Sequence, residues 1–304
     1  MTLSKKDLMS EEEFTLLKEL INKEFGIQLK GDKRLTFHTK VSHRLNILGL
    51  KSYRDYYEFI ISDSSREELF TLASHITNNE TYFFREKMQL EVFSNLLKGI
   101  KKERLKKNQN ILKILSLACS SGEEAYTLNI LVQESGLFMW DWDIRIIGID
   151  IDKNALKKAK GASYTKNSFR LNGNIDIVNK YFTAEGDRYN LRKIFTKNVA
   201  FRHGNLLDIN SFTDINDIDV VFCRNVLIYM NDSAISRIIK NLYNSLTDSG
   251  YLFIGSAESL IQRTGLFSPE YNNGIIVYRK NQHRHCEGQS PEAISRRDSS
   301  LRSE

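Results

Sequence analysis

Short apolar runs rich in β-branched residues alternate with helical patterns along the last two thirds of the chain, and this alternation restricts the fold more than any other feature. The runs cover residues 111–118, 144–150, 218–223, 251–255 and 275–280. Helical patterns begin between them, near Glu123, Asp152 and Asp232. Strands that alternate with helices form a mostly parallel sheet covered on both faces. We therefore predict an α/β domain over residues 110–280.

The first 78 residues show helical periodicity without a strand pattern, and we predict a small all-helical domain over 1–78. Ser10 followed by Glu13 is a capping-box pattern, and apolar residues then recur at helical spacing up to Gly26. Three further helices are expected over 32–49, from Ser52 and from near Ser64. Because the whole chain has two prolines, these helices can run without interruption.

Three stretches differ from this two-domain pattern. Residues 79–109 are predicted to form a linker helix with a basic, solvated end. Residues 163–197 contain aromatic residues separated by turn residues, without a long apolar period. We predict that they form an inserted β-subdomain with a small helix and a hairpin. Residues 281–304 are polar and charged, and we predict that they are disordered.

The composition excludes several classes of protein. With 304 residues, 41% of them hydrophobic, the chain can build a packed core. Three scattered cysteines and no CxxC pair argue against a disulfide framework or a zinc site, so no metal is expected. The sequence has no signal-peptide pattern and no apolar run of about 18 residues, which predicts a cytoplasmic protein that is not inserted in a membrane. A net charge of +6 fits an acidic partner or a nucleic acid.

Two residues follow the first two predicted strands at the edge where open parallel sheets bind ligands. Gly122 lets the backbone pass close to a ligand at the N-terminus of the next helix. Asp150 ends the second strand, where a carboxylate can accept hydrogen bonds from ribose hydroxyls. Two plainer interpretations remain open, since Gly122 can be an ordinary turn residue and Asp152 can cap the following helix.

The missing phosphate motifs narrow the choice of cofactor. The chain has neither the GxGxxG pattern of dinucleotide-binding proteins nor a P-loop. An adenosine-containing cofactor without phosphates fits better, and S-adenosylmethionine is the obvious candidate.

Five sequence blocks resemble those of the chemotaxis receptor methyltransferases, the CheR family. They are TNNETYFFRE at 77–86, CSSGEEAY at 119–126, GIDID at 148–152, FCRNVLIY at 222–229 and GYLFIGSAESL at 250–260. The resemblance runs from about residue 10 to 280. It implies a helical N-terminal domain, a Rossmann-like S-adenosylmethionine-dependent methyltransferase domain and an inserted β-subdomain. Ala125 stands where the family usually has proline, and little effect is expected because alanine is a good helix former.

The resemblance also implies the activity and the site. The activity is methyl esterification of glutamate side chains in the cytoplasmic helical region of chemoreceptors, used in chemotaxis adaptation. Arg85 and Tyr229 would act in catalysis by orienting the reactants. The cofactor contacts would come from Asn79, Thr81, Arg85, Glu124, Asp150, Asn205, Leu206, Arg224 and Asn225. Without the motif, Tyr229 would be taken for an ordinary buried tyrosine. Residues 82–84 are expected to belong to the interdomain core rather than to stack on a ligand.

Three basic residues are candidates for substrate binding. Lys33, Lys40 and Arg44 share one face of the predicted helix over 32–49. Such a face is usually only solvated. However, the resemblance implies a glutamate-rich helical substrate, which a basic face would attract. The short loop after residues 181–182 predicts that no C-terminal receptor tether is used, and a monomer is expected.

Two other functions stay open at this point. A methyltransferase that acts on a small molecule or a nucleic acid would fit the basic charge. The chain has no recognised nucleic-acid-binding motif, so no nucleic-acid partner is expected. A non-catalytic receptor-docking module would have lost the cofactor blocks, which are intact here.

Overall fold

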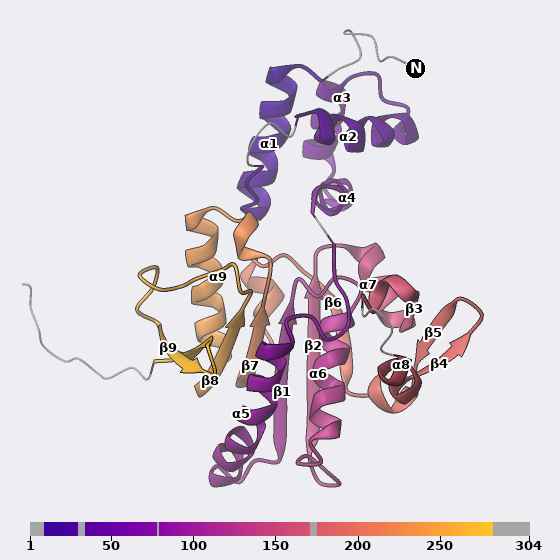
Figure 1. The fold of residues 1–304 in the computed structure, drawn as a ribbon. Coiled ribbons are helices and arrows are strands. Elements are labelled where there is room, and N and C mark those ends of the chain that lie inside the picture. The colour runs from indigo at the N-terminus through magenta and orange to yellow at the C-terminus, as the bar shows by residue number, and fades with distance from the viewer. Residues whose placement is uncertain (1–8, 30–33, 78, 171–174, 282–304) are drawn as a thin grey trace, which may run out of the picture.

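Four helices stand above one end of a large sheet in the computed structural model, which describes residues 9–29, 34–77, 79–170 and 175–281 (Figure 1). They are α1 (Glu11–Phe25), α2 (Arg34–Leu48), α3 (Tyr53–Ser62) and α4 (Glu67–Ile76). The predicted capping box of α1 is present, because Glu13 N–H donates to Ser10 Oγ and Ser10 N–H donates to the Glu13 carboxylate. Gly26, at φ 69°, ends the helix as predicted.

The fourth helix begins later than its sequence predicts. Asp63 Oδ1 accepts a hydrogen bond from Ser65 N–H, and Asp63 Oδ2 accepts one from Glu68 N–H. Residues 63–66 therefore form a turn, and Arg66 takes a left-handed conformation at φ 60°. The third helix begins where predicted, with Ser52 Oγ accepting from Asp55 N–H.

The central sheet has seven strands in the order β6-β2-β1-β7-β8-β10-β9. The strands are β1 (Ile111–Leu117), β2 (Asp143–Asp150), β6 (Val199–His203), β7 (Ile218–Cys223), β8 (Leu246–Ile254), β9 (Phe267–Asn272) and β10 (Ile275–Lys280). The first five in spatial order run parallel, and β10 is antiparallel to both of its neighbours. The chain leaves β1 toward β2 on one side and reaches β7 on the other, so the strand order reverses there, as in ligand-binding α/β sheets.

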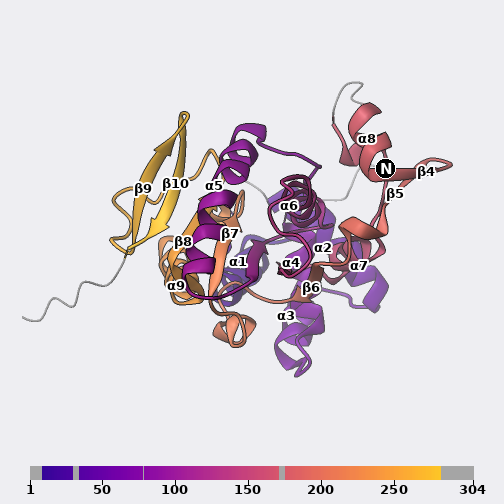
Figure 2. The same ribbon diagram turned by 90° about the horizontal axis from the view of Figure 1, so that it is seen from below.

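Helices cover both faces of this sheet, as the sequence predicts. They are α5 (Lys87–Lys106), α6 (Glu123–Glu134), α7 (Lys153–Gly161) and α9 (Asp232–Ser245). Figure 2 shows α5 and α6 on one face and α9 on the other. Successive strand residues alternate between the two cores: Ile114 packs with residues of α5, α6 and α7, whereas Leu115 packs with residues of α9 and the N-terminal helices.

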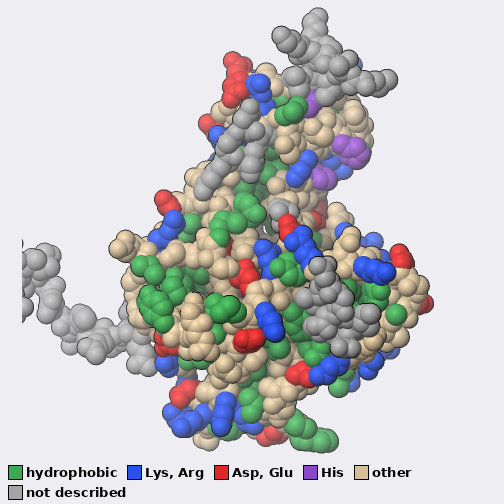
Figure 3. Space-filling view, viewed as in Figure 1, with side chains coloured by type: hydrophobic (Ala, Val, Ile, Leu, Met, Phe, Trp, Pro, Cys, Tyr) green, Lys and Arg blue, Asp and Glu red, His purple; other side chains and the backbone are tan. Residues whose placement is uncertain are grey.

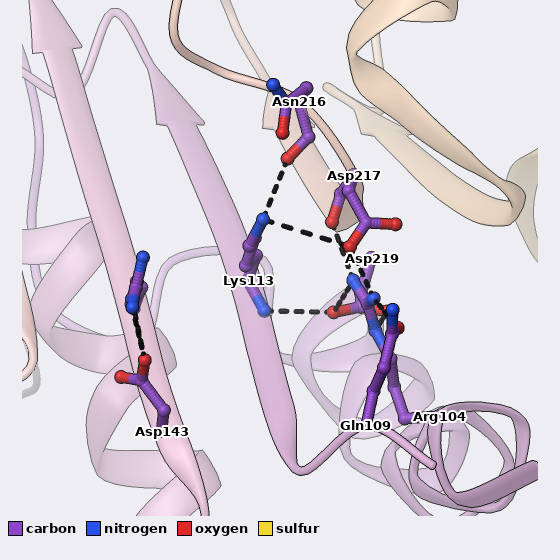
Figure 4. Close-up of polar contacts among 8 residues, drawn as sticks. Arg104, Gln109, Lys113, Asp143, Asn216, Asp217 and Asp219 are labelled. Carbon is purple, nitrogen blue, oxygen red and sulfur yellow. Dashed lines mark hydrogen bonds and ion pairs between the residues drawn. The ribbon is translucent and has the colours of Figure 1, made fainter. Parts of the chain in front are cut away.

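A buried ionic cluster attaches the end of α5 to the amino ends of β1 and β7 (Figure 4). The side chain of Arg104 is 2% exposed, and its guanidinium donates to both carboxylate oxygens of Asp219. It also donates to the Asp217 carboxylate and to Gln109 Oε1, at 2.6 Å each. α5 ends two residues after Arg104, at Lys106, within the basic segment that the sequence predicts for the end of this helix. Lys and Arg side chains gather at the bottom of Figure 3.

Residues 163–197 contain the small helix and the hairpin that the sequence predicts. The hairpin consists of β4 (Phe182–Glu185) and β5 (Arg188–Leu191). Strand β5 also pairs with the short strand β3 (Ser163–Tyr164), which makes a three-stranded sheet. The helix is α8 (Ile175–Tyr181). Phe83 packs against three aromatic rings of this unit, those of Tyr164, Phe169 and Phe182. Phe83 is thus the core residue that the sequence predicts.

Two strands of the central sheet, β6 and β9, are absent from the sequence prediction. β6 lies at the edge of the parallel part, and only Phe201 among its five residues is buried. β9, at the other edge, contains a proline and one buried residue, Phe267. No helix of the described chain is long and apolar enough to cross a bilayer. The predicted domain limits at 78, 109 and 280 stay predictions, and the predicted disordered tail falls, from residue 282 on, outside the described residues.

Candidate active site

One cleft opens at the carboxyl ends of β1, β2 and β7, beneath the N-terminal helices. It is lined by segments far apart in the sequence, from α1, the stretch after α4, and the loops that follow these strands. Every residue predicted for the cofactor or for catalysis lies on its wall: Asn79, Thr81, Arg85, Glu124, Asp150, Asn205, Leu206, Arg224, Asn225 and Tyr229. The fold therefore brings four of the five sequence blocks to a single place, whereas the block at 250–260 contributes no residue to the described cleft wall.

The turn between β1 and α6 has an unusual backbone. Ala118, Ser120 and Gly122 have φ angles of 52°, 48° and 89°. A Cβ at Gly122 would lie 2.8 Å from the Phe201 ring and 2.9 Å from Ala159 Cβ, so only glycine fits there. Two non-glycine residues in left-handed conformations within one turn indicate a functional segment. The glycine that the sequence singles out thus has both a conformational and a packing reason.

Asp150 is the most buried acid of the cleft wall, with 5% of its surface exposed. Ser120 N–H donates to its Oδ2 at 2.7 Å, and Asp152 N–H donates to its Oδ1 at 2.8 Å. Burial raises the pKa of this carboxyl to about 6, against an ordinary value of 3.8. Each oxygen keeps a further lone pair for a hydroxyl donor in the cleft.

Asp152 has the capping role that the sequence left open. Its Oδ1 accepts from the N–H groups of Asn154 and Ala155 at the start of α7. Its Oδ2 accepts from Asn79 Nδ2 at 2.6 Å. Asp152 therefore also fixes Asn79, a predicted cofactor contact, from behind the cleft.

A buried ion pair crosses the floor of the cleft. Arg224 Nε lies 2.9 Å from Glu124 Oε2, and their side chains are 2% and 15% exposed. Ser116 Oγ donates to the other Glu124 oxygen at 2.7 Å, and Arg224 also donates to Gln89 Oε1 and to the Arg85 carbonyl. Glu124 thus presents a carboxylate, in a fixed orientation, to whatever occupies the cleft.

Arg85 lies in a small cationic and aromatic cluster on the cleft wall. Its guanidinium donates to the Glu80 carbonyl at 3.0 Å and lies 5.7 Å from the centre of the Tyr82 ring. Arg170 lies 5.1 Å from the same ring and forms an ion pair with the Glu80 carboxylate. Tyr82 therefore contacts two guanidinium groups and lines the cleft. The expectation that it belongs to the interdomain core is wrong.

Tyr229 is in a short loop that contacts the N-terminal helical region. Its carbonyl accepts a hydrogen bond from Gln28 N–H at 2.7 Å, and Ile27 forms a β-bridge with Met230. Asn205 joins the same two parts, because its side-chain amide donates to the Glu24 carbonyl at 2.8 Å. The side chain of Tyr229 is half-buried, so it is not the ordinary buried tyrosine that the bare sequence indicates.

The three basic residues proposed for substrate binding have different surroundings. Lys40 is exposed on α2, whereas Lys33 lies outside the described residues. Arg44 is paired internally: Nε and Nη2 donate to the two carboxylate oxygens of Glu68, at 2.7 and 2.5 Å. Tyr56 donates to the same carboxylate at 2.8 Å. Arg44 therefore joins α2 to α4 through Glu68, and its role in substrate binding stays a prediction.

Sequence reasoning missed some residues around the cleft. Arg170 lies in the stretch between β3 and α8, and no spacing in the sequence points from there to Arg85. Glu80 and Tyr82 fall inside a recognised block, but only a view of the cleft wall distinguishes them from core residues. Cys119 and Cys223 are buried, as expected of small apolar residues at strand ends, and burial raises the pKa of both thiols.

The donor set of the cleft can be compared with candidate ligands. Its described wall carries three carboxylates, from Glu80, Glu124 and Asp150, and two guanidinium groups, from Arg85 and Arg224. This balance suits a cationic sulfonium with an amino-acid end better than a pyrophosphate. No three His, Cys, Asp or Glu side chains among the described residues are arranged to hold a metal ion. The residues present thus fit S-adenosylmethionine.

Comparisons with known proteins agree with this fit. Residues 79–273 match the family described as CheR methyltransferase, SAM binding domain, and residues 12–77 match its all-alpha domain. The chain is 30% identical over 262 residues to chemotaxis protein methyltransferase 2 of Vibrio cholerae, covering 86% of this chain and 90% of that one. It is 30% identical over 274 residues to chemotaxis protein methyltransferase 1 of Pseudomonas aeruginosa, covering 88% and 97%.

A third relative, the chemotaxis protein methyltransferase of Borreliella burgdorferi, is 28% identical over 258 residues, covering 83% of this chain and 89% of the relative. The chain therefore matches these three relatives over most of their length. S-adenosylmethionine is the cofactor of this protein, and the chain belongs to the CheR family of methyltransferases.

Proposed function

We propose that this protein transfers a methyl group from S-adenosylmethionine to glutamate side chains in the cytoplasmic helical region of chemoreceptors, as a cytoplasmic monomer that serves chemotaxis adaptation. The observation that carries this proposal is the gathering of ten motif residues on one cleft wall. The names of the relatives, chemotaxis protein methyltransferases, support the receptor as substrate.

Each end of the cofactor has matching groups in the cleft. Asp150 would accept hydrogen bonds from the ribose hydroxyls, because its carboxylate is anchored by two backbone N–H groups. Glu124 would hold the ammonium of the amino-acid end and Arg85 its carboxylate. The adenine would lie beside Asn205 and Leu206, and contacts from Asn79, Thr81, Arg224 and Asn225 would complete the site.

The chemistry requires positioning more than proton transfer. S-adenosylmethionine supplies, when bound, a methyl group already activated by the sulfonium. A glutamate carboxylate is ionised at neutral pH and is already a nucleophile, so no general base is needed. Arg85 and Tyr229 orient the reactants and exclude water from the carboxylate, and catalysis then comes from alignment and desolvation.

The substrate approaches a surface of mixed charge. Lys40 is exposed on α2, and Arg170 lies at the cleft beside Arg85. Together with Lys33 these cations would attract a glutamate-rich helix, while Arg44 acts mainly through Glu68. β4 and β5 are joined by residues 186 and 187 alone, and this short connection supports the proposal that no receptor tether is used.

The test is calorimetric titration with S-adenosylhomocysteine, followed by a methyl-transfer assay on a helical receptor fragment. Micromolar binding that Asp150→Ala abolishes, with label transferred to the fragment, is the expected result. The control is the same fragment with its glutamates replaced by glutamine, which cannot form the ester. Cofactor binding without transfer to any receptor fragment would contradict the substrate, and no binding by folded protein would contradict the enzyme.

A further inference from the structure

Glu258 follows β8 and is not among the residues that line the cleft. Its carboxylate nevertheless accepts hydrogen bonds from the loop after β7, and that loop lines the cleft. Its Oε2 accepts hydrogen bonds from the backbone N–H groups of Asn225 at 2.9 Å and of Gly255 at 2.6 Å. Its Oε1 accepts from the Ile228 N–H at 3.1 Å. Three main-chain donors thus converge on one carboxylate, and two of them belong to the loop that ends at Tyr229.

This loop has a conformation that needs support. Asn225 has φ 58°, in the left-handed region that residues with a side chain rarely occupy. Gly255 lies so close that a Cβ there would be 2.7 Å from Asn225 Nδ2 and 2.9 Å from the Asn225 nitrogen. A strained backbone of this kind persists only where its surroundings hold it. The bonds from Asn225 and Ile228 to Glu258 supply that hold.

A second carboxylate, that of Glu86, contacts the side chain of Asn225 and the loop after β8. Glu86 Oε1 accepts from Asn225 Nδ2 at 3.2 Å, and Glu86 Oε2 accepts from Ser256 N–H at 3.3 Å. Glu86 therefore orients the side chain of Asn225, whereas Glu258 fixes the main chain on both sides of the turn toward Tyr229. The two acids can be separated by experiment.

We infer that Glu258 is a positioning residue for methyl transfer: it sets the main chain of residues 225–228 and thereby places Tyr229 and Asn225 against the cleft. The inference rests on the proposed function, in which those two residues contact the reactants. A carboxylate is required at this position, because both of its oxygens accept from N–H donors. Glutamine would keep one acceptor and turn its NH₂ group toward a donor.

The experiment compares Glu258→Gln, Glu86→Gln and the matched control Glu270→Gln. Glu270 lies on β9, at the far edge of the sheet, and pairs with Arg279. Glu258→Gln is expected to lower kcat about tenfold at saturating concentrations of both substrates, with KM for the receptor fragment within twofold, since lost charge-assisted hydrogen bonds have effects of this size. Glu86→Gln should lower kcat less, and Glu270→Gln should stay within twofold. A wild-type kcat in Glu258→Gln would overturn the inference.

Hydrogen exchange separates positioning from loss of the fold. In Glu258→Gln, a peptide covering 224–229 is expected to exchange faster, while a peptide covering β1 keeps its protection. Equal protection of the loop peptide in both proteins would overturn the inference. If the glutamine variant does not fold, Glu258→Asp is measured instead. Its shorter side chain keeps the carboxylate, and its kcat should lie between the wild-type value and one tenth of it. If the wild-type protein binds no S-adenosylhomocysteine, the proposed function fails, and the exchange of the loop peptide alone decides whether Glu258 holds the loop.

Discussion

Arg104 and Asp219 form a bidentate ion pair inside the protein, with Arg104 Nε 2.7 Å and Nη2 3.0 Å from the two carboxylate oxygens. The Arg104 side chain is 2% exposed and that of Asp219 is 6% exposed. Arg104 lies in the last turn of α5, and Asp219 lies in β7, whose far end leads into the loop that lines the cleft. The pair therefore anchors α5 to the sheet at the end opposite the active site.

Replacing Arg104 by leucine should destabilise the protein by about 3–5 kcal/mol, because Asp219 would remain buried without its partner. Urea unfolding of the variant and the wild type measures this difference. The control is Arg145→Leu, which removes an ion pair to Asp143 whose side chains are 60% and 49% exposed, and which should change stability little. Equal losses in the two variants would show that burial does not govern the effect.

Cofactor affinity should depend on pH through Asp150. In the proposed function the ionised carboxylate would accept hydrogen bonds from the ribose hydroxyls, and burial raises its pKa to about 6. The affinity for S-adenosylhomocysteine should therefore be constant above pH 7 and fall toward tenfold per pH unit below 6. Calorimetry between pH 5 and 8 checks this, with Asp150→Asn expected to bind weakly and without this dependence. An unchanged Kd at pH 5 in the wild type would contradict the role of Asp150.

The same pKa has an opposite consequence for the stability of the protein without cofactor. The folded pKa of Asp150 is higher than its ordinary value of 3.8, so the folded protein holds this proton more tightly than the unfolded chain does. The contribution of Asp150 to the free energy of unfolding is therefore full below about pH 4 and is lost as the pH rises through 6. Relative to Asp150→Asn, the wild type should therefore lose stability as the pH rises from about 4 to about 6 and show a constant difference outside this window, which urea unfolding across the pH range measures.

Tyr229→Phe should retain more activity than Arg85→Ala. The aromatic ring of the first variant still fills its place, whereas the second removes a guanidinium that contacts the Glu80 carbonyl and the Tyr82 ring. A loss of about tenfold for Tyr229→Phe and of about a hundredfold or more for Arg85→Ala is expected in a methyl-transfer assay, as for groups that orient rather than exchange protons. The reverse order would indicate that the Tyr229 hydroxyl takes part in proton transfer.

Arg44 and Lys40 should differ although both are basic residues of α2. Arg44→Gln breaks the bidentate pair with Glu68 and should destabilise the protein by about 2 kcal/mol. Lys40→Gln should leave the unfolding transition unchanged, raise KM for the receptor fragment severalfold and weaken the dependence of the rate on salt. Thermal unfolding and rates at 50 and 300 mM salt measure the two effects. A salt-independent rate in the wild type would contradict electrostatic docking.

Much of the fold follows from local patterns. The capping box at Ser10, the glycine stop at Gly26 and the strongly apolar central strands act within a few residues, so the sequence predicts them directly. The edge strands β6 and β9 are missed because one buried residue in each leaves almost no periodic pattern. Their pairing with a neighbouring strand, which is a non-local interaction, makes them strands.

The site is predictable to a similar extent. Asp150 and Gly122 follow from strand ends, while the other cleft residues come from the resemblance to a known family. Glu258 lies in a recognised block, but its hydrogen bonds to Asn225 and Ile228 join two loops that only the parallel pairing of β7 and β8 brings together. The double pairing of Arg44 is hidden for the same reason, because Glu68 lies on another helix.

The β-bridge between Ile27 and Met230, with the bond from Gln28 to the Tyr229 carbonyl, means that the N-terminal helices form one wall of the reaction site and do more than present a docking surface. An exchange of these helices with those of a relative would therefore alter the geometry at Tyr229 along with the choice of receptor. Under the proposed function, substrate preference and turnover would depend on the same contact between the two domains, and a change in one is expected to carry a change in the other.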